Sequence, residues 1–215
     1  PIPSRGLGDV YKRQDYDTLG DQDSYVYIGT EFAQATASPS HLFKFHMSEG
    51  GLRVPLIMSG PGINKGKNHN FAFVTDIAAT ISDIVFDEVD ERIIGKSLQN
   101  SLAGSNENNY EDFEAVGLEV TGNSALFKGN YKIVRNRPPN GSNQWELYNL
   151  HEDPGETQDL SKIMPDKLFE LIEDYDQYAQ INGVIELPLD YQWAEEMTIN
   201  TCLLYTSPSP RDGIG

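Results

Sequence analysis

Apolar residues along this chain follow two different patterns, with the change near residue 105. Before that point, the clearest apolar run is LRVPLIMSG, Leu52–Gly60, which lies between Gly-Gly and Gly-Pro-Gly. A short continuous apolar run between turn residues is typical of a buried strand, and Pro55 favours a sheet edge or the start of the strand. The next run, VTDIAATISDIVFDE, indicates a helix because its apolar residues recur at three- and four-residue steps: Val74, Ile77, Ile81, Ile84 and Val85.

The segments around this strand and helix complete the expectation for the first part. SYVYIGTEFAQATASPSHLFKF has scattered aromatic residues and a Ser-Pro-Ser break, which predicts an ordered but irregular loop. Thr75 or Asp76 is the expected N-cap of the helix. A strand, a loop and a helix in this order indicate the end of a layered α/β domain.

After the polar stretch Ala103–Asp112, the chain changes to short strand-like runs. FEAVGLEVTG, SALFKG, YKIVRN and QWELYNL are separated by turns rich in Gly, Asn and Pro, which predicts an antiparallel meander. A helix is expected from Pro165 to a stop at Gly183. Its predicted apolar face consists of Leu168, Leu171, Ile172, Tyr175 and Tyr178. The second part is therefore expected to be a small α+β subdomain, an antiparallel sheet covered by one helix.

The two ends of the chain are related at the level of DNA. Codons compatible with Ser4–Gln14, read on the opposite strand in a shifted frame, encode Cys202–Asp212. This DNA is similar to a transposase adaptor used in sequencing libraries, so both ends are expected to be non-native tails. The expected domains are 1–14 (tail), 15–104 (end of the α/β domain), 105–201 (small subdomain) and 202–215 (tail).

Composition narrows the classes of partner. The formal net charge of -17 argues against nucleic-acid binding, which needs clustered cations. Hydrophobic residues make up 38% of the chain, which is typical of globular protein, and no apolar run is long enough to span a membrane. The sequence leaves the compartment open, with a periplasmic or secreted location slightly favoured over a cytoplasmic one.

Polar chemistry is concentrated in one short segment that contains His41, Lys44, His46 and Glu49. The two histidines are five residues apart with no third ligand nearby, so no metal site is predicted here. Judged from the residues alone, Lys44 is either a solvated surface lysine or a cation that binds an anion. A different hypothesis is a non-catalytic binding module, in which the small sheet presents Trp145 and Tyr148 to a ligand.

Two motifs and their order resemble the C-terminal third of bacterial arylsulfatases. The first is Lys-x4-Glu-Gly-Gly-x-Arg-x-Pro, starting at Lys44, and the second is Leu-Tyr-Asn-Leu-x-x-Asp-Pro-Gly-Glu, starting at Leu147. The resemblance covers nearly all of residues 15–183 and is weakest from Asp87 to Asp112. It implies an alkaline phosphatase-like α/β domain followed by a small antiparallel subdomain, in an enzyme that hydrolyses sulfate esters.

The resemblance also implies roles for single residues. Lys44 matches the family lysine that contacts the sulfate group, and His46 is a weaker candidate for the substrate mouth. Glu49 and Arg53 match positions taken as structural, and Asp76 matches an acidic position at a helix start, where capping is preferred. The Gly-Gly pair is expected to let the backbone reverse sharply.

Sulfatases use calcium and a formylglycine made from Cys or Ser, and neither the Cys/Ser-x-Pro-x-Arg motif nor the acidic metal motifs occur here. Cys202 is followed by Leu-Leu-Tyr-Thr and does not match. The missing groups are expected in the rest of the sulfatase chain, upstream, which leaves this fragment inactive alone. A phosphodiesterase or phosphonate hydrolase of the same superfamily is the alternative.

Overall fold

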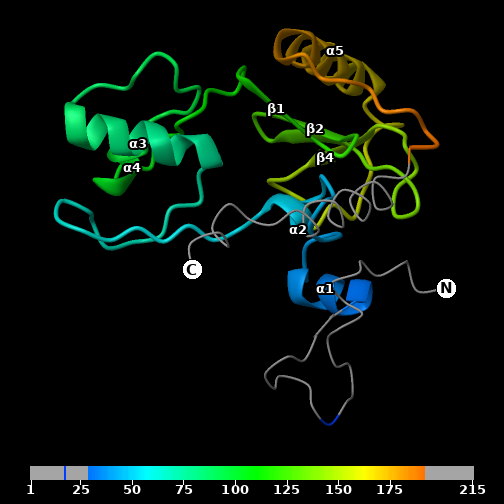
Figure 1. Cartoon of the computed structure of the whole chain (residues 1–215), viewed down its shortest axis with the longest axis horizontal. Coiled ribbons are helices and arrows are strands. Elements are labelled where there is room, and N and C mark those ends of the chain that lie inside the picture. Colours follow the sequence, from blue (N-terminus) through cyan, green and yellow to red (C-terminus); the bar gives the residue numbers. More distant parts are fainter. Residues whose placement is uncertain (1–16, 18–28, 192–215) are drawn as a thin grey trace, which may run out of the picture.

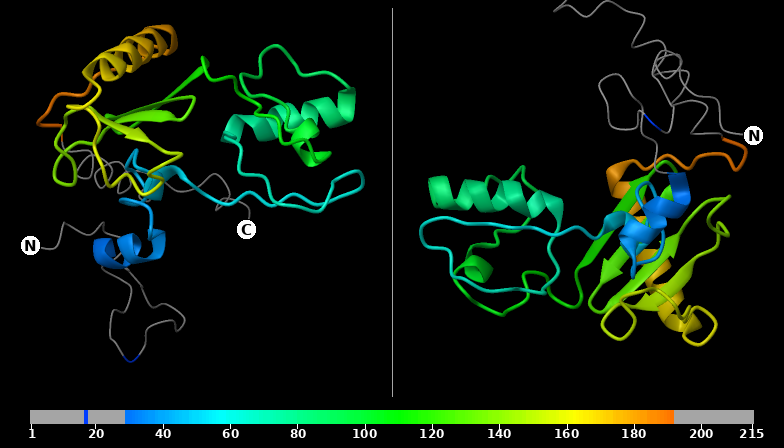
Figure 2. Two further views of the ribbon diagram at one scale, coloured as in Figure 1. Left: turned by 180° about the vertical axis from the view of Figure 1, so that it is seen from behind. Right: turned by 90° about the horizontal axis from the view of Figure 1, so that it is seen from below.

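The computed structural model describes Asp17 and residues 29–191 and arranges them in two lobes (Figure 1). The helices are α1 (Gly29–Ala37), α2 (Glu49–Leu52), α3 (Val74–Phe86), α4 (Gln99–Leu102) and α5 (Pro165–Asn182), and the strands are β1 (Ala115–Val120), β2 (Asn123–Lys128), β3 (Tyr131–Arg135) and β4 (Glu146–Asn149). The sheet and α5 form one lobe, and α3 with α4 forms the other. Figure 2 shows extended segments joining the lobes before α3 and after α4. The expected tails, 1–14 and 202–215, lie outside the described residues.

The four strands form one antiparallel sheet in the order β1-β2-β3-β4, which confirms the predicted meander. Leu126 of β2 pairs with Ile133 of β3, and Ile133 pairs in turn with Leu147 of β4. Between β1 and β2, Thr121 and Gly122 both have positive φ, of 52° and 79°. Two successive residues with positive φ give the turn whose twist matches that of a tight hairpin.

Helix α5 covers one face of the sheet. Leu126, Ile133 and Leu147 are buried against Leu171 and Tyr175 of this helix. All five residues of the predicted apolar face belong to this core, and Trp145 joins it with its ring centroid 4.9 Å from that of Tyr175. The helix begins at Pro165 and ends before Gly183, whose φ of 65° is left-handed, so both predicted ends are confirmed.

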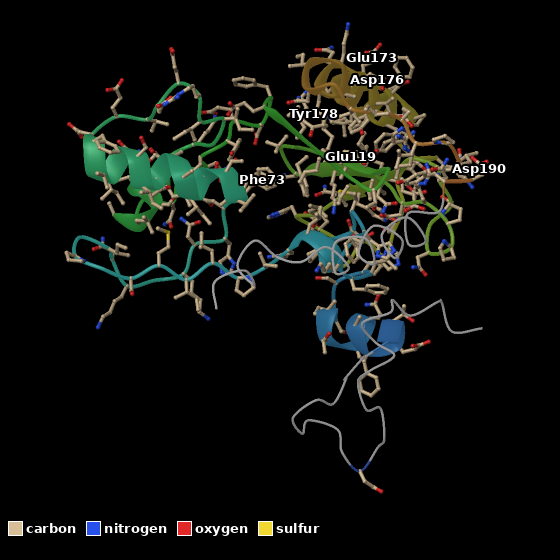
Figure 3. The ribbon with its side chains drawn as sticks, in the orientation of Figure 1. Phe73, Glu119, Glu173, Asp176, Tyr178 and Asp190 are labelled. Atoms are coloured by element: carbon tan, nitrogen blue, oxygen red, sulfur yellow. The ribbon has the colours of Figure 1, made fainter. Side chains whose placement is uncertain are left out.

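The side chains of α5 confirm which side of the helix faces the sheet. Figure 3 shows Tyr178 on the side of the sheet, whereas Glu173 and Asp176 lie on the outer side of α5. A Cβ on Gly117 would lie 2.3 Å from Cγ of Tyr178, so this ring occupies the space above a glycine of β1. Burial raises the pKa of the Tyr178 hydroxyl, and the charge of Glu119 acts in the same direction.

Residues 47–52 cover the opposite face of the sheet. Met47 is buried with Ala125, Val134 and Tyr148, and Leu52 packs against this cluster. Both rings of the binding-module hypothesis are therefore core residues, with Trp145 under α5 and Tyr148 on the other face. The hypothesis loses its main feature. The predicted division at residue 104 stays a prediction, although residues 47–52 pack with the small subdomain.

The apolar run 52–60 does not form the predicted strand. Leu52 ends α2, and the following residues are irregular, with Val54 78% and Ile57 90% exposed. Strands form by pairing with a neighbour, and none of the strand pairs found among the described residues includes this run. Val54, Leu56 and Ile57 of this run are therefore exposed, although the apolar pattern predicted that they would be buried.

Helix α3 forms where it was predicted, but a different face is buried. Asp76, Ala79 and Thr80 are buried, whereas four of the predicted apolar positions are exposed: Val74, Ile81, Ile84 and Val85. The N-cap is Phe73, so the expectation of Thr75 or Asp76 is wrong. The buried face of α3 is the polar one because its side chains bind neighbouring backbone groups. The Thr80 hydroxyl, for example, accepts the backbone N–H of Leu98 at 2.9 Å.

The expectation of an irregular loop before residue 42 is wrong for Gly29–Ala37, which form α1. Glu31, Ala33, Gln34 and Ala35 favour helix strongly, and this local preference outweighs the scattered aromatic residues. The helix ends just before Ser38-Pro39, as expected from the restriction that proline places on the residue before it.

Candidate functional site

Lys44 lies in the loop Leu42–Ser48, between α1 and α2. The side chain is exposed, and its Nζ lies 5.0 Å from the centroid of the Phe45 ring. No ion pair found among the described residues includes Lys44. Leu42 and Phe45 have left-handed φ values of 58° and 77°, which cost about 1–2 kcal/mol for each non-glycine residue. The loop therefore keeps its shape through contacts with its surroundings.

The two glycines after Glu49 are required by space. A Cβ on Gly50 would lie 2.0 Å from the carbonyl oxygen of Leu42, and a Cβ on Gly51 would lie 2.2 Å from that of His46. Neither glycine has a positive φ, so the expected reason, conformational freedom, is wrong. The backbone of α2 lies directly against the backbone of the loop, and Gly50 donates its N–H to the carbonyl of His41 at 2.8 Å.

Two asparagines of the small subdomain, Asn123 and Asn136, hold the loop. Nδ2 of Asn123 donates to the carbonyl of Phe45 at 2.8 Å. Oδ1 of Asn136 accepts the backbone N–H of Met47 at 2.8 Å, and its Nδ2 donates to the Ser48 hydroxyl at 2.9 Å. Asn123 begins β2, and Asn136 directly follows β3. One end of the β2–β3 hairpin thus contacts the loop at three residues that follow Lys44.

The His46 ring is fixed by contacts at both nitrogens. Its Nδ1 lies 3.0 Å from the carbonyl oxygen of Phe43, and its Nε2 lies 3.1 Å from Nδ2 of Asn140. A carbonyl oxygen can only accept, so Nδ1 carries the hydrogen and Nε2 accepts from the amide. The ring is 7% exposed and packs edge-on against Phe43. Its assignment to substrate binding stays a prediction.

A buried ion triad joins the two sequence motifs. The Lys132 side chain is 0% exposed, and its Nζ lies 2.8 Å from Oε1 of Glu49 and 2.7 Å from Oε1 of Glu156. The backbone N–H of Glu49 also donates to Oε2 of Glu156, at 2.8 Å. Glu49 belongs to the Glu-Gly-Gly motif and Glu156 to the Asp-Pro-Gly-Glu motif, so one lysine of β3 connects them.

The charges of the triad do not balance, because it contains two carboxylates and one ammonium. Burial raises the pKa of Glu156, and the charge and hydrogen bond of Lys132 act in the opposite direction. Sequence reasoning missed Lys132 and Glu156. The available signal was a lysine in the middle of the apolar run YKIVR, at a position that alternation places on a sheet face.

Asp76 and Arg53 differ in their surroundings. Asp76 is fully buried, and its Oδ2 accepts the N–H of Phe73 at 2.7 Å, which is a capping contact at the helix start. Its Oδ1 accepts the N–H of Lys96 at 2.8 Å and the hydroxyl of Tyr110 at 2.6 Å. Burial, together with the hydrogen bond and charge of Asp76, raises the pKa of Tyr110. Arg53 is exposed, and the ion pairs found among the described residues do not include it.

The described part of the chain contains no group of three or more His, Cys, Asp or Glu side chains that could hold a metal ion. Within the same residues, no helix has both the length and the apolar character needed to cross a membrane. The site therefore consists of an exposed cation on a loop that is clamped by the small subdomain. Chemically, such a site can contact an anion through a point charge.

Comparison with known proteins identifies similar chains. Residues 40–177 match the protein family described as N-sulphoglucosamine sulphohydrolase, C-terminal. An uncharacterized sulfatase of Schizosaccharomyces pombe is 34% identical over 196 residues, which cover 81% of this chain and 33% of that protein. Arylsulfatase K of Xenopus laevis is 24% identical over 159 residues, covering 69% of this chain and 30% of that protein.

Solved structures share the fold. The crystal structure of Ps i-CgsB matches with a TM-score of 0.58 and 18% identity, over 79% of this chain and 38% of that one. This likeness shows the fold, an α/β arrangement with a small antiparallel subdomain. The chain spans about a third of the length of the curated relatives that it matches.

Proposed function

We propose a function from one premise: the chain belongs to the sulfatase family and carries the C-terminal region of its N-sulphoglucosamine sulphohydrolase type. We infer that it is the C-terminal part of a sulfuric ester hydrolase of the arylsulfatase kind. In that enzyme Lys44 contacts the sulfate group of the substrate. The relatives favour this reading over a phosphodiesterase or phosphonate hydrolase.

One observation carries the role of Lys44: its ammonium is exposed and has no carboxylate partner among the described residues, while the loop beneath it is fixed. Three lysines of the lobe that contains the sheet are paired with carboxylates: Lys128, Lys132 and Lys167. Lys162 is exposed and belongs to none of the ion pairs among the described residues, which makes it the comparison for Lys44. A sulfate ester presents anionic oxygens, and an ammonium is a compact charge that can stabilise them. A fixed loop lowers the cost of holding that charge in place.

The groups for the chemical step are assigned to the rest of the parent enzyme. The described residues contain no group of three or more His, Cys, Asp or Glu side chains of the kind that would hold calcium. Nor does the sequence contain the Cys/Ser-x-Pro-x-Arg motif from which a formylglycine is made in sulfatases. Calcium and formylglycine would supply the metal charge and the nucleophile there, and Lys44 would add a positive charge at the sulfate.

Two exposed apolar surfaces are the proposed contacts with that remaining chain. Val54, Leu56 and Ile57 form one, in the segment after α2, and Ile84 and Phe86 of α3 belong to the other. All five side chains are at least half exposed. Neighbouring apolar side chains that are exposed together mark interaction surfaces.

The proposal is tested in a full-length enzyme that contains this segment, with an aryl sulfate as substrate. We expect Lys44→Ala to lower kcat by about a hundred- to a thousandfold, the cost of removing one preorganised oxyanion donor. Lys44→Arg should restore only part of the rate, because a planar fork does not reproduce a point charge. The matched control is Lys162→Ala, an exposed lysine before α5, which should change kcat less than about twofold. A near wild-type rate for Lys44→Ala would refute the role.

The same assay tests where the chemistry resides. Because the nucleophile and metal groups are assigned elsewhere, the chain with this sequence alone should give no turnover of an aryl sulfate and no stoichiometric calcium binding. Turnover by the purified chain, with contaminating sulfatase excluded by a Lys44→Ala preparation made in parallel, would contradict that assignment.

A further inference from the structure

We propose that Asn123 and Asn136 are positioning residues for Lys44, a role that rests on the proposed function of that lysine. The two side chains act through the loop backbone and touch neither the lysine nor its ligand. Asn123 binds the carbonyl of the residue directly after Lys44, and Asn136 binds the N–H of the third residue after it. Together they form an asparagine clamp on the loop.

The clamp has a defined geometry because each side-chain amide is engaged at both ends. While Nδ2 of Asn123 donates to Phe45, its Oδ1 accepts the N–H of Arg137 at 2.7 Å. While Oδ1 of Asn136 accepts from Met47, its Nδ2 donates to the hydroxyl of Ser48. Both asparagines are buried, so neither amide can rotate without leaving a polar atom unsatisfied.

The sheet brings the two asparagines together. Ser124 pairs with Arg135 in the β2–β3 ladder, so the residues just outside this pair, Asn123 and Asn136, lie at the same end of the hairpin. The distance along the chain between each asparagine and its loop partner is 78 and 89 residues. The small subdomain therefore sets the loop position from a rigid sheet.

The loop needs such a clamp because its conformation is intrinsically unfavourable. Leu42 and Phe45 both lie in the left-handed region, where side chains other than glycine are disfavoured. The Phe45 carbonyl is held by Asn123, and the Phe45 ring lies 5.0 Å from the Lys44 ammonium. Fixing this carbonyl consequently fixes the backbone from which the Phe45 ring and the Lys44 side chain project.

The chemistry of the amide predicts a characteristic pattern of variants. Asn123→Asp places a carboxylate oxygen against the Phe45 carbonyl, and two acceptors repel each other, so the loop should be released. Asn136→Asp keeps the oxygen that accepts from Met47, and the Ser48 hydroxyl can turn to donate to the new oxygen. The same isosteric change is therefore expected to be damaging at Asn123 and mild at Asn136.

The first experiment uses the chain with this sequence and measures amide hydrogen exchange. Asn136→Ala should accelerate exchange of the Met47 N–H by about tenfold or more, while the N–H of Ile133 in the sheet stays protected. Asn136→Asp should change the Met47 rate less than about threefold. Asn182→Ala, which removes a side-chain bond to a backbone carbonyl at the end of α5, is the matched control and should leave Met47 unchanged. Unchanged exchange of Met47 in Asn136→Ala, or equal acceleration of all amides, would overturn the clamp.

The second experiment is a double-mutant cycle in a full-length enzyme. With Lys44 present, Asn123→Asp should lower kcat about tenfold or more, and Asn136→Asp about threefold or less. In a Lys44→Ala background, Asn123→Asp should cost less than about twofold, because there is no longer an ammonium to position. An equal loss in both backgrounds would overturn the inference and leave the asparagines with a role in folding alone. If Lys44→Ala has no effect by itself, the proposed function fails, and the exchange experiment decides the clamp independently.

Discussion

Replacing Lys132 with methionine perturbs the charge that joins three separate parts of the fold. Nζ of Lys132 lies 2.8 Å from Glu49 and 2.7 Å from Glu156, and its side chain is fully buried. Methionine keeps an apolar chain of similar length, so the change removes mainly the charge and its hydrogen bonds. Removing one partner of a buried ion pair costs about 3–5 kcal/mol, because the remaining charge is left uncompensated.

Two carboxylates lose their counter-charge here, so we expect a loss near the upper end, about 5 kcal/mol. Small domains have a total free energy of unfolding of about 5–15 kcal/mol, so the variant should be close to unfolded at neutral pH. Lys128→Met is the matched control. Lys128 also binds two carboxylates, Glu170 and Asp174, but the Glu170 side chain is 45% exposed. Lys128 itself is 17% and Asp174 23% exposed, so these pairs are partly solvated, whereas Lys132 is fully buried. Exposed ion pairs contribute about 0–1 kcal/mol, so the control should lose clearly less stability than Lys132→Met.

The pH dependence gives an independent test of the same reasoning. Burial raises the pKa of Glu156 above the ordinary glutamate value, and Lys132 opposes this rise. When the pKa of a carboxyl is higher in the folded than in the unfolded protein, its protonation stabilises the fold. This stabilisation is complete at pH values below the unfolded-state pKa and is lost as the pH rises through the folded-state pKa. Without Lys132 the pKa of Glu156 should rise further. The stability deficit of Lys132→Met should therefore shrink as pH falls from about 7 to about 5.

Urea unfolding followed by circular dichroism measures the free energies directly. Converting Glu49 and Glu156 to glutamine in the Lys132→Met background should recover part of the loss, since buried ion groups can be replaced by neutral ones at little cost. The reasoning is refuted if Lys132→Met loses no more stability than Lys128→Met. It is also refuted if the deficit grows as the pH is lowered.

Two further substitutions test the packing around the loop and the sheet. Gly50→Ala places a Cβ 2.0 Å from the Leu42 carbonyl oxygen and should lower the free energy of unfolding by about 3 kcal/mol, the upper part of the range for overpacking. The control Gly66→Ala has open space around its Cβ and should be tolerated, and thermal unfolding compares the two variants. Tyr175→Phe removes the hydroxyl that donates to Ser124 at 2.9 Å, and should lower the free energy of unfolding in urea by about 1 kcal/mol. A decrease of no more than a few tenths of a kcal/mol would show that this hydrogen bond does not stabilise the fold.

The sheet and α5 could be predicted from the sequence because their apolar faces are satisfied within the small lobe. Leu171 and Tyr175 recur at helical spacing, and they are buried against the sheet as the period requires. The run 52–60 failed as a strand for the opposite reason. Its apolar pattern is local, but strand formation depends on a neighbour, and Ile57 stays exposed in the described part of the chain.

The candidate site was only partly visible in the sequence. Lys44 and Glu49 stand out because they belong to a motif, whereas Asn123, Asn136 and Lys132 are ordinary polar residues in strand-like runs. Their importance comes from burial and from contacts that span up to 89 residues of chain. Periodicity reports which side of an element faces inward, but it does not report which distant backbone group a polar side chain meets.

The central claim is that the small subdomain holds Lys44 against the sulfate group of a substrate. A crystal structure of a full-length enzyme containing this segment, with sulfate or a sulfate ester bound, tests it most directly. We expect Nζ of Lys44 to lie about 2.7–3.2 Å from a sulfate oxygen, the range of a hydrogen bond. Asn123 and Asn136 should still bind Phe45 and Met47 in that structure. A lysine tip directed into bulk solvent, with the sulfate held entirely by other residues, would contradict the claim.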